Sequence, residues 1–223
     1  NYGQTQEIPR FLDNVDYGDK ERVDDTAVVL ADESLLFSTL SVFPENVNNV
    51  NVTMGYPVKN SVIYGFLLLL INLLKNRTGK DKNEVVVYHR FVTDVLNHQL
   101  LSNVEPDKKN EYVGKLKENN LLNVSPEEID FSPLHSLIFA FPEKISDYSS
   151  YFLNVLSGLF GMIKESEPDN QLLPEVIYSI FQGVEKVSMV VENLDNDESI
   201  ILSEAIYFRL FEQYLGQISV PFE

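Results

Sequence analysis

The sequence contains no cysteine among its 223 residues. Disulfide bonds, thiolate metal ligands and a cysteine nucleophile are therefore excluded, and we expect a cytoplasmic protein, because disulfides are typical of secreted chains. Basic residues are also scarce: 17 Lys and Arg stand against 34 Asp and Glu, for a formal net charge of −17. A general phosphate-binding surface and docking on anionic lipid are both disfavoured, because each needs clustered Lys and Arg.

The sequence also lacks an apolar run long enough to span a membrane. The longest such run extends from Val62 to Leu74 and is interrupted by Gly65 and Asn72. A membrane-spanning helix needs about 20 apolar residues, so we predict a helix buried on all sides and no membrane partner. The hydrophobic content of 44%, with 14 Phe and 11 Tyr, is sufficient for a folded core.

An α/β pattern occupies the first quarter of the chain. The run Thr26–Ala31 is almost wholly apolar and rich in β-branched residues, as in a strand buried on both faces. Asp32 is a predicted N-cap for a helix over Glu33–Phe43, which Pro44 ends. The alternation over Val50–Met54 predicts a second strand. Together these elements predict a βαβ unit, which needs further strands to form a stable sheet.

Helical periodicity follows the turn predicted at Gly55-Tyr56-Pro57. A short β-like run at Glu84–Tyr88 interrupts it, and Ser125-Pro126-Glu127-Glu128 has the spacing of a capping box at a helix start. Ranges with helical spacing are 60–77, 91–101, 106–119, 146–163, 173–194 and 199–216. The residues Ile218, Val220 and Phe222 alternate with polar ones or Pro221, which predicts the start of a strand.

The most regular helix carries a heptad seam made of Leu173, Ile177, Ile180, Val184, Val187, Val191 and Leu194. Such a seam suits either a coiled-coil partner or a long helix packed inside a bundle. Phe181 lies beside Ile180 and widens the apolar face, which favours the bundle.

These patterns predict an α+β fold that is mainly helical, with a partial βαβ unit (a Rossmann-like half) followed by a helical bundle domain. The predicted domains are a partial α/β segment at 1–56, a helical domain at 57–217 and the start of a returning strand at 218–223. The chain starts at Asn1 without an initiator methionine or signal-peptide pattern. We therefore expect a piece of a larger protein, about one and a half domains in extent.

Motifs that would carry chemistry are missing. The sequence has no Gly-x-x-x-x-Gly-Lys-Ser/Thr loop, no Gly-x-Gly-x-x-Gly after the first predicted strand and no Gly-x-Ser-x-Gly. His89, His98 and His135 lack the i,i+4 partners of a metal site, so surface or capping roles are expected. We assign no catalytic, cofactor-binding or metal-ligating residue, and the chain itself is expected to hold no cofactor.

Acidic motifs give equally weak signals. Pro106-Asp107 and Pro168-Asp169 match the first half of a Pro-Asp…Asp/Glu-x-Lys nuclease signature, but no matching second half follows, and helix punctuation explains both pairs better. The acidic stretches Asp13–Asp25 and Asp195–Glu198 lack the spacing of a calcium loop, so solvated loops are the better interpretation.

The stretch Asp25–Leu36 resembles the start of the second motor domain in superfamily 1 helicases of the UvrD/Rep, RecB and AddB type, where a strand is followed by a helix. Val50–Pro57 stands where that family has a short strand ending in a Gly-Ile-Pro-like turn. Val62–Leu74 and the helices after it stand where the family has the helical insertion called 2B. Tyr88–His98 resembles a helix that ends near a proline-containing pattern, with Gln99 in place of the proline.

The resemblance covers about residues 20–223 and extends to AddB-type helicase-nucleases of the Bacteroides group, where a segment like Ile218–Glu223 leads into the next motor motif. It implies a degenerate 2A start with a 2B-like insertion. The parent protein would carry a PD-(D/E)XK exonuclease, process double-strand breaks in DNA repair and recombination, and use ATP and Mg²⁺ where its motor is intact. Active members have an aromatic or basic pair where this chain has Ala31 and Asp32, so no catalytic residue is carried over.

Three hypotheses follow. The first is a non-catalytic accessory segment of a DNA-repair helicase-nuclease, which scaffolds the rest of its parent chain, DNA or a partner subunit. The second is a free-standing acidic helical module for protein–protein interaction, based on the net charge and the heptad seam. The third is a small-molecule enzyme on an α/β fold, which is the weakest because no nucleophile–base pair or metal constellation is present in the sequence.

Overall fold

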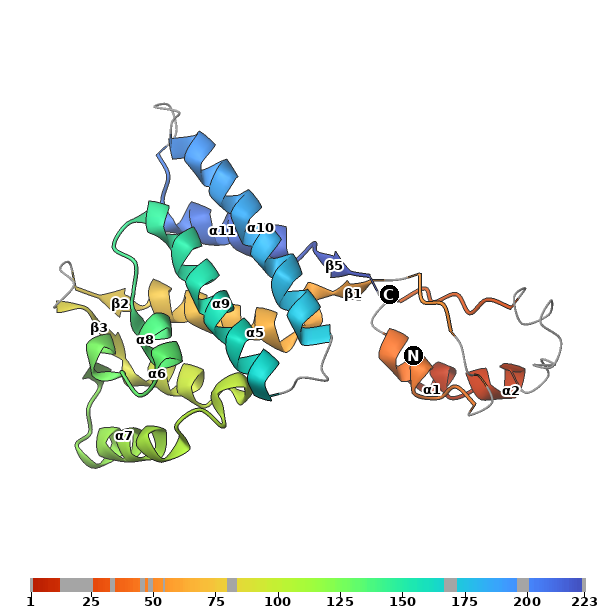
Figure 1. Cartoon of the computed structure of the whole chain (residues 1–223), viewed down its shortest axis with the longest axis horizontal. Coiled ribbons are helices and arrows are strands. Elements are labelled where there is room, and N and C mark those ends of the chain that lie inside the picture. Colours follow the sequence, from red (N-terminus) through yellow and green to blue (C-terminus); the bar gives the residue numbers. More distant parts are fainter. Residues whose placement is uncertain are drawn as a thin grey trace. The chain divides into compact units, whose positions relative to one another are not determined.

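Figure 1 shows the chain in a computed structural model, which describes residues 2–12, 26–32, 35–44, 47, 50–53, 55–79, 84–166, 172–195 and 201–221. The chain divides into two compact units. The first unit comprises Asn1–Gly55 together with Pro221–Glu223, and the second comprises Tyr56–Val220. The second unit is thus one continuous segment that interrupts the first unit in the sequence.

The described part of the first unit contains three short helices: α1 (Tyr2–Thr5), α2 (Ile8–Leu12) and α4 (Leu36–Leu40). Helices α1 and α4 pack together, and Leu36 and Thr39 of α4 are buried. In the described part of the helix predicted over Glu33–Phe43, the α-helix spans Leu36–Leu40. Beyond Leu40, the amides of Val42 and Phe43 donate to carbonyls three residues earlier, in turn geometry.

The two strands predicted in the first unit are wrong. Thr26–Ala31 and the described part of Val50–Met54 belong to neither of the two sheets. Val29 is 89% exposed, so the first run is not covered on both faces. An apolar run becomes a buried parallel strand only where neighbouring strands take up its backbone hydrogen bonds, and no strand occurs in the described part of this unit. The predicted βαβ unit is not formed.

Two antiparallel strands carry the chain into and out of the second unit: β1 (Tyr56–Pro57) and β5 (Ser219–Val220). Pro57 pairs with Ser219, and the next rung is a hydrogen bond of 2.9 Å from the amide of Val58 to the carbonyl of Ile218. Pro57 therefore occupies a non-hydrogen-bonded pair, where its missing N–H is no loss. We call β1 and β5 the neck. The strand predicted to start at Ile218 is confirmed at Ser219–Val220, whereas Tyr56 and Pro57 of the turn predicted at Gly55-Tyr56-Pro57 are extended.

A second small sheet lies within the same unit and has the antiparallel order β2-β3-β4: β2 (Arg77–Thr78), β3 (Val86–Tyr88) and β4 (Asn123–Val124). The predicted β-like run at Glu84–Tyr88 is thereby confirmed from Val86 onward. Gly79 follows β2 with a φ of +110°, a region that favours glycine. A Cβ atom there would collide with the carbonyl oxygen of Glu84.

Helices make up most of the second unit: α5 (Val62–Lys75), α6 (His89–Leu96), α7 (Pro106–Glu118), α8 (Pro133–Phe139), α9 (Tyr148–Ser166), α10 (Leu172–Asp195) and α11 (Glu204–Leu215). Helix α5 is buried on several sides, with Ile63, Phe66 and Leu70 fully covered, as its long apolar run predicts. Ser61 caps it, because its hydroxyl accepts a hydrogen bond from the amide of Tyr64 at 3.1 Å.

The heptad seam of α10 faces the interior of the second unit. The helix packs against α9 and α11, and Figure 1 shows α9 running beside it. Seam residues such as Ile180, Val184 and Val187 are buried in the common core. The bundle interpretation of this helix is therefore confirmed, and the seam is filled by helices of the same chain.

Two helix starts differ from prediction. Ser125 begins only the 3₁₀ helix η5 (Pro126–Glu128), and its side chain makes no cap hydrogen bond. The last helix begins at Glu204 with Ser203 as its cap, whereas the predicted start, Ser199, lies outside the described residues.

The α+β, mainly helical fold is confirmed. None of the described helices has both the length and the apolar character needed to cross a bilayer.

Candidate functional site

A cleft in the second unit gathers charged and apolar side chains from separate stretches of the chain. It has a volume of about 740 Å³, is open to solvent, and falls in the size range of ligand-binding pockets. Its walls come from the β2–β3 hairpin, η5 and the residues after it, α8, and the loop between α8 and α9. The lining residues that matter here are Arg77, Val85, Glu127, Asp130, Phe141, Glu143 and Lys144. We call it the hairpin cleft.

Arg77 of β2 forms part of the wall, and its guanidinium makes three hydrogen bonds. One terminal nitrogen donates to the carbonyl of Pro142 at 2.5 Å. The other donates to the hydroxyl of Tyr148 at 2.7 Å and to the carboxylate of Glu204 at 2.7 Å. The Arg77 side chain is 16% exposed. Its charge is therefore balanced by the carboxylate of Glu204.

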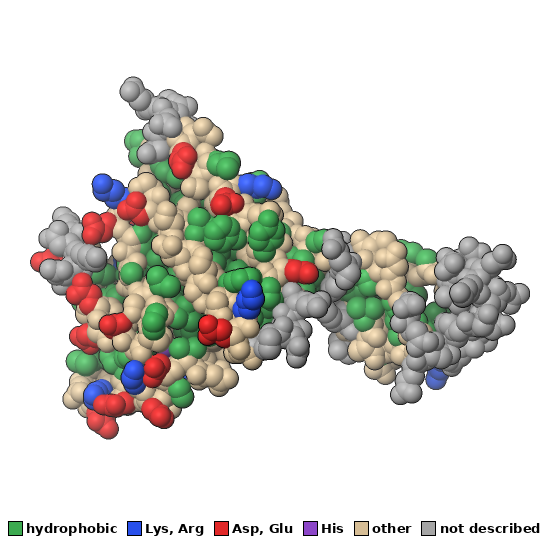
Figure 2. Space-filling view, in the orientation of Figure 1, with side chains coloured by type: hydrophobic (Ala, Val, Ile, Leu, Met, Phe, Trp, Pro, Cys, Tyr) green, Lys and Arg blue, Asp and Glu red, His purple; other side chains and the backbone are tan. Residues whose placement is uncertain are grey.

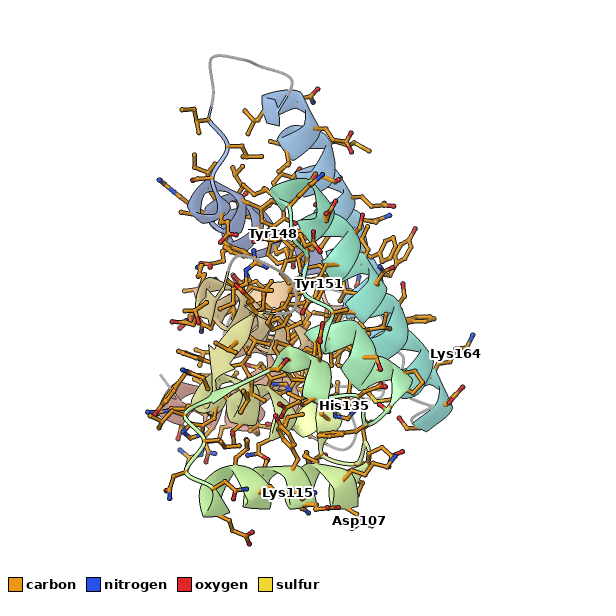
Figure 3. All side chains as sticks on the ribbon, turned by 90° about the vertical axis from the view of Figure 1, so that its left-hand side faces the viewer. Asp107, Lys115, His135, Tyr148, Tyr151 and Lys164 are labelled. Carbon is orange, nitrogen blue, oxygen red and sulfur yellow. The ribbon has the colours of Figure 1, made fainter. Side chains whose placement is uncertain are left out.

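Two tyrosines, Tyr148 and Tyr151, support this wall of the cleft. Tyr148 stacks on Phe208 with ring centroids 5.2 Å apart and donates a hydrogen bond to Glu204 at 2.5 Å. Tyr151 donates to the carbonyl of Ile138 at 2.6 Å, which ties α9 to α8. Both tyrosines lie near the start of α9 in Figure 3. Burial raises the pKa of the Tyr151 phenol well above its usual value, so the tyrosine acts as a neutral structural donor.

Carboxylates dominate the rim of the cleft. Glu127, Asp130 and Glu143 are exposed, and Lys144 is the accompanying cation. Asp130 also accepts a hydrogen bond from the hydroxyl of Ser136 on α8. The distribution agrees with the wider surface, since Figure 2 shows acidic side chains spread over the second unit with Lys and Arg between them.

A serine–histidine pair lies at the start of α8, the helix that contributes Ser136 and Phe139 to the cleft. The Ser132 hydroxyl and Nδ1 of His135 are 2.8 Å apart, within the range of a nucleophile and its base. However, Ser132 is the N-cap of α8 and accepts from the His135 amide, which fully explains the contact. His135 is completely buried, and its Nε2 has no hydrogen-bond partner among the described residues. Within the described part of the chain no third group hydrogen-bonds to this imidazole, and the pair serves as a helix cap.

Burial and the nearby charge of Lys109 lower the pKa of His135, so its imidazole is neutral at pH 7. Lys109 is itself buried, and its ammonium donates to the carbonyls of Leu101 and Ser102 at 3.3 and 3.2 Å. These two hydrogen bonds of Lys109 connect α7 to the segment before it. Helices α7 and α8 appear one below the other in Figure 3.

The other residues tested for chemistry in the sequence have structural positions. Nδ1 of His98 accepts from the amide of Leu100, a capping role, and His89 begins α6. Pro106 and Asp107 open α7, as helix punctuation predicts. Asp13–Asp25, Pro168-Asp169 and residues 196–198 lie outside the described part of the chain. Among the residues that the structure describes, no group of three His, Cys, Asp or Glu could hold a metal ion.

Comparisons with protein-family models, with curated proteins and with solved structures found no match to this chain. The functional argument therefore depends on the neck and on the hairpin cleft.

The cleft was not predicted from the sequence, because its walls come from segments near residue 77 and near residues 126–144 that no local pattern connects. The isolated Arg77 between an apolar helix and a glycine loop was the one available signal.

Proposed function

We propose that this chain is a non-catalytic segment of a DNA-repair helicase-nuclease that processes double-strand breaks, in which residues 56–220 form a helical insertion within a motor-like domain. The supporting observation is the neck. The chain enters the helical unit along β1 and leaves it along the neighbouring antiparallel strand β5, and the residues on both sides of that unit cluster together as one unit. Adjacent entry and exit points are typical of inserted domains.

The role that fits these features is that of a scaffold. No constellation for nucleotide hydrolysis or metal-assisted chemistry is present in the described residues, and the acidic rim of the hairpin cleft would repel phosphate. ATP and Mg²⁺ would accordingly be bound by other parts of the parent protein. The partners we propose are those other parts, the motor and nuclease domains, together with DNA and a partner helicase-nuclease subunit. The cytoplasm is the proposed location.

The free-standing interaction module has lost its main support. Its heptad seam was the candidate contact surface for a second chain, and α9 and α11 already cover that seam. We therefore keep the scaffold as the proposed function.

Two observations test the proposal. The reading frame on both sides of this segment should encode a Walker A loop, or its remnant, upstream and a Pro-Asp…Glu-x-Lys set downstream.

In the source organism, replacing codons 56–220 by a short glycine–serine linker should leave a folded parent protein, because the neck holds the two junctions side by side. That strain should be sensitive to agents that break both DNA strands. Survival equal to that of the wild type, or a reading frame without either flanking motif, would overturn the proposal.

A further inference from the structure

The unpaired charges at the hairpin cleft are more negative than a count of its lining residues suggests. Arg77 and Lys144 are both present, but the Arg77 charge is paired with Glu204 at 2.7 Å inside the wall. The exposed rim is left with three carboxylates, those of Glu127, Asp130 and Glu143, and one ammonium group. A ligand approaching the cleft therefore meets net negative charge, which favours cationic groups and disfavours phosphates.

Apolar surface lies between these carboxylates. Phe141 and Val85 are half-buried in the lining, which also includes the buried side chains of Ile129 and Phe139. Long basic side chains suit such a surface, because their methylene stems can cover the apolar lining while the charged ends reach the rim. A ligand with basic and apolar groups in alternation would use both features.

The wall of the cleft also includes an edge strand. In the sheet formed by the described residues, β2 lies at the outside of the order β2-β3-β4. Arg77 of this strand and Gly79 directly after it both line the cleft. An edge strand can accept an extended peptide as an additional strand, in which alternate side chains point to the same side. An extended peptide therefore matches the cleft better than a compact small molecule does.

We propose that the hairpin cleft binds an extended segment of a partner protein in which lysine or arginine alternates with apolar residues. This proposal goes beyond the scaffold function and does not depend on it, because it uses only the charge, the lining and the edge strand of the cleft.

Fluorescence anisotropy on the full chain tests the proposal. The probe is a fluorescein-labelled heptapeptide in which three lysines alternate with valines, measured at 50 mM NaCl. We expect a dissociation constant in the micromolar range that weakens severalfold at 300 mM NaCl, because exposed charge pairs are screened by salt. The same peptide with glutamate in place of lysine should not bind. Methylation of alternate backbone nitrogens should weaken binding at least fivefold, because a methylated amide cannot pair with a strand.

A matched pair of variants localises the binding. The double substitution Glu127→Gln and Glu143→Gln should weaken the lysine peptide about tenfold, in line with two lost exposed charge contacts. The double substitution Glu165→Gln and Glu192→Gln changes the net charge equally at exposed sites on α9 and α10 and should leave binding unchanged. Unfolding midpoints in urea verify that both variants are folded.

Three outcomes would overturn the proposal. One is the absence of binding of the lysine peptide up to 1 mM. Another is an equal loss in both double variants, which would mean nonspecific attraction to an acidic surface. The last is displacement by spermidine at the same concentration as by unlabelled peptide, with no effect of backbone methylation, which would leave a site for small cations only.

Discussion

At the scale of single residues, Arg77 joins three parts of the second unit, since it bonds to Pro142, Tyr148 and Glu204. We expect Arg77→Met to lower the free energy of unfolding by about 2–3 kcal/mol, because it leaves the partly buried carbonyl and carboxylate without their donor. Urea denaturation followed by circular dichroism measures this change.

The comparison for this variant is Lys75→Met. Lys75 forms an ion pair with Glu212 at 3.0 Å, but its side chain is 41% exposed. An exposed pair contributes less than about 1 kcal/mol, so the loss should be smaller than that of Arg77→Met. Equal losses in the two variants would show that the Arg77 contacts do not hold the wall of the cleft together.

Two glycines in neighbouring helices should respond to alanine with opposite signs. A Cβ at Gly183 of α10 would come within 2.5 Å of side-chain atoms of Leu215 and Ile218, whereas a Cβ at Gly161 of α9 would meet nothing within 4 Å. Gly183→Ala should destabilise the protein by about 1–2 kcal/mol through overpacking. Gly161→Ala should stabilise it by about 0.5–1 kcal/mol, because alanine is the better helix former. Thermal melts of both variants measure the two signs, and stabilisation by Gly183→Ala would contradict the close packing.

The free energy of unfolding should depend on pH because of two histidines, His98 and His135. Burial lowers the pKa of His98; for His135, burial acts together with Lys109 and Lys108, while Glu105 opposes them. In the unfolded chain both titrate near 6.5, so below that pH the unfolded state binds more protons than the folded state. The free energy of unfolding should therefore fall as the pH decreases from about 6.5 towards the folded-state pKa values.

Urea midpoints at pH 7.5 and pH 5.5 measure this fall. The variant His135→Gln removes one of the two groups, so its midpoint should change less between the two pH values than that of the wild type. A midpoint that rises at pH 5.5 would contradict the assignment of neutral, buried imidazoles.

At the scale of elements, α10 provides a matched test of its two faces. Val184 is buried in the seam, whereas Met189 is 62% exposed. Val184→Asp should destabilise the second unit by more than about 4 kcal/mol, because it buries a charge without a partner. Met189→Asp places the same group on the same helix in water and should change the free energy of unfolding by less than about 1 kcal/mol. Circular dichroism and urea titration compare them, and a folded Val184→Asp protein would reopen the seam as a contact surface for another chain.

The elements that the sequence predicts well are those whose pattern is local. The seam of α10, the apolar α5 and the helix start at Pro106 depend on residues within a few turns of each other, and all three are present. The run Thr26–Ala31 was misassigned because strand formation depends on partners that a local pattern does not contain. The charge of the hairpin cleft could not be predicted for the same reason, since it depends on the pairing of Arg77 with Glu204, which are far apart in the sequence.

At the scale of the whole chain, the neck can be tested by a cross-link. Pro57 and Ser219 form a non-hydrogen-bonded antiparallel pair, which is the closer type and suits a disulfide. The sequence has no cysteine of its own, so Pro57→Cys with Ser219→Cys introduces a single possible bridge. We expect it to form under mild oxidation and to stabilise the second unit by about 4 kcal/mol, because it closes a very long loop.

Non-reducing electrophoresis and urea midpoints with and without dithiothreitol measure this effect, and each single cysteine variant is the control. Bridges that form only between separate molecules would show that the two strands are not adjacent in the native protein.

The neck also determines how the protein responds to a pulling force. Its strands are antiparallel, and the chain continues from both of them at the same end of the ladder, next to the pair Tyr56 and Val220. A force that separates Gly55 from Pro221 would therefore open the rungs one after another, like a zipper, instead of loading them all at once. The helical unit would carry no tension until the last rung had opened, so the neck would yield mechanically before the core behind it.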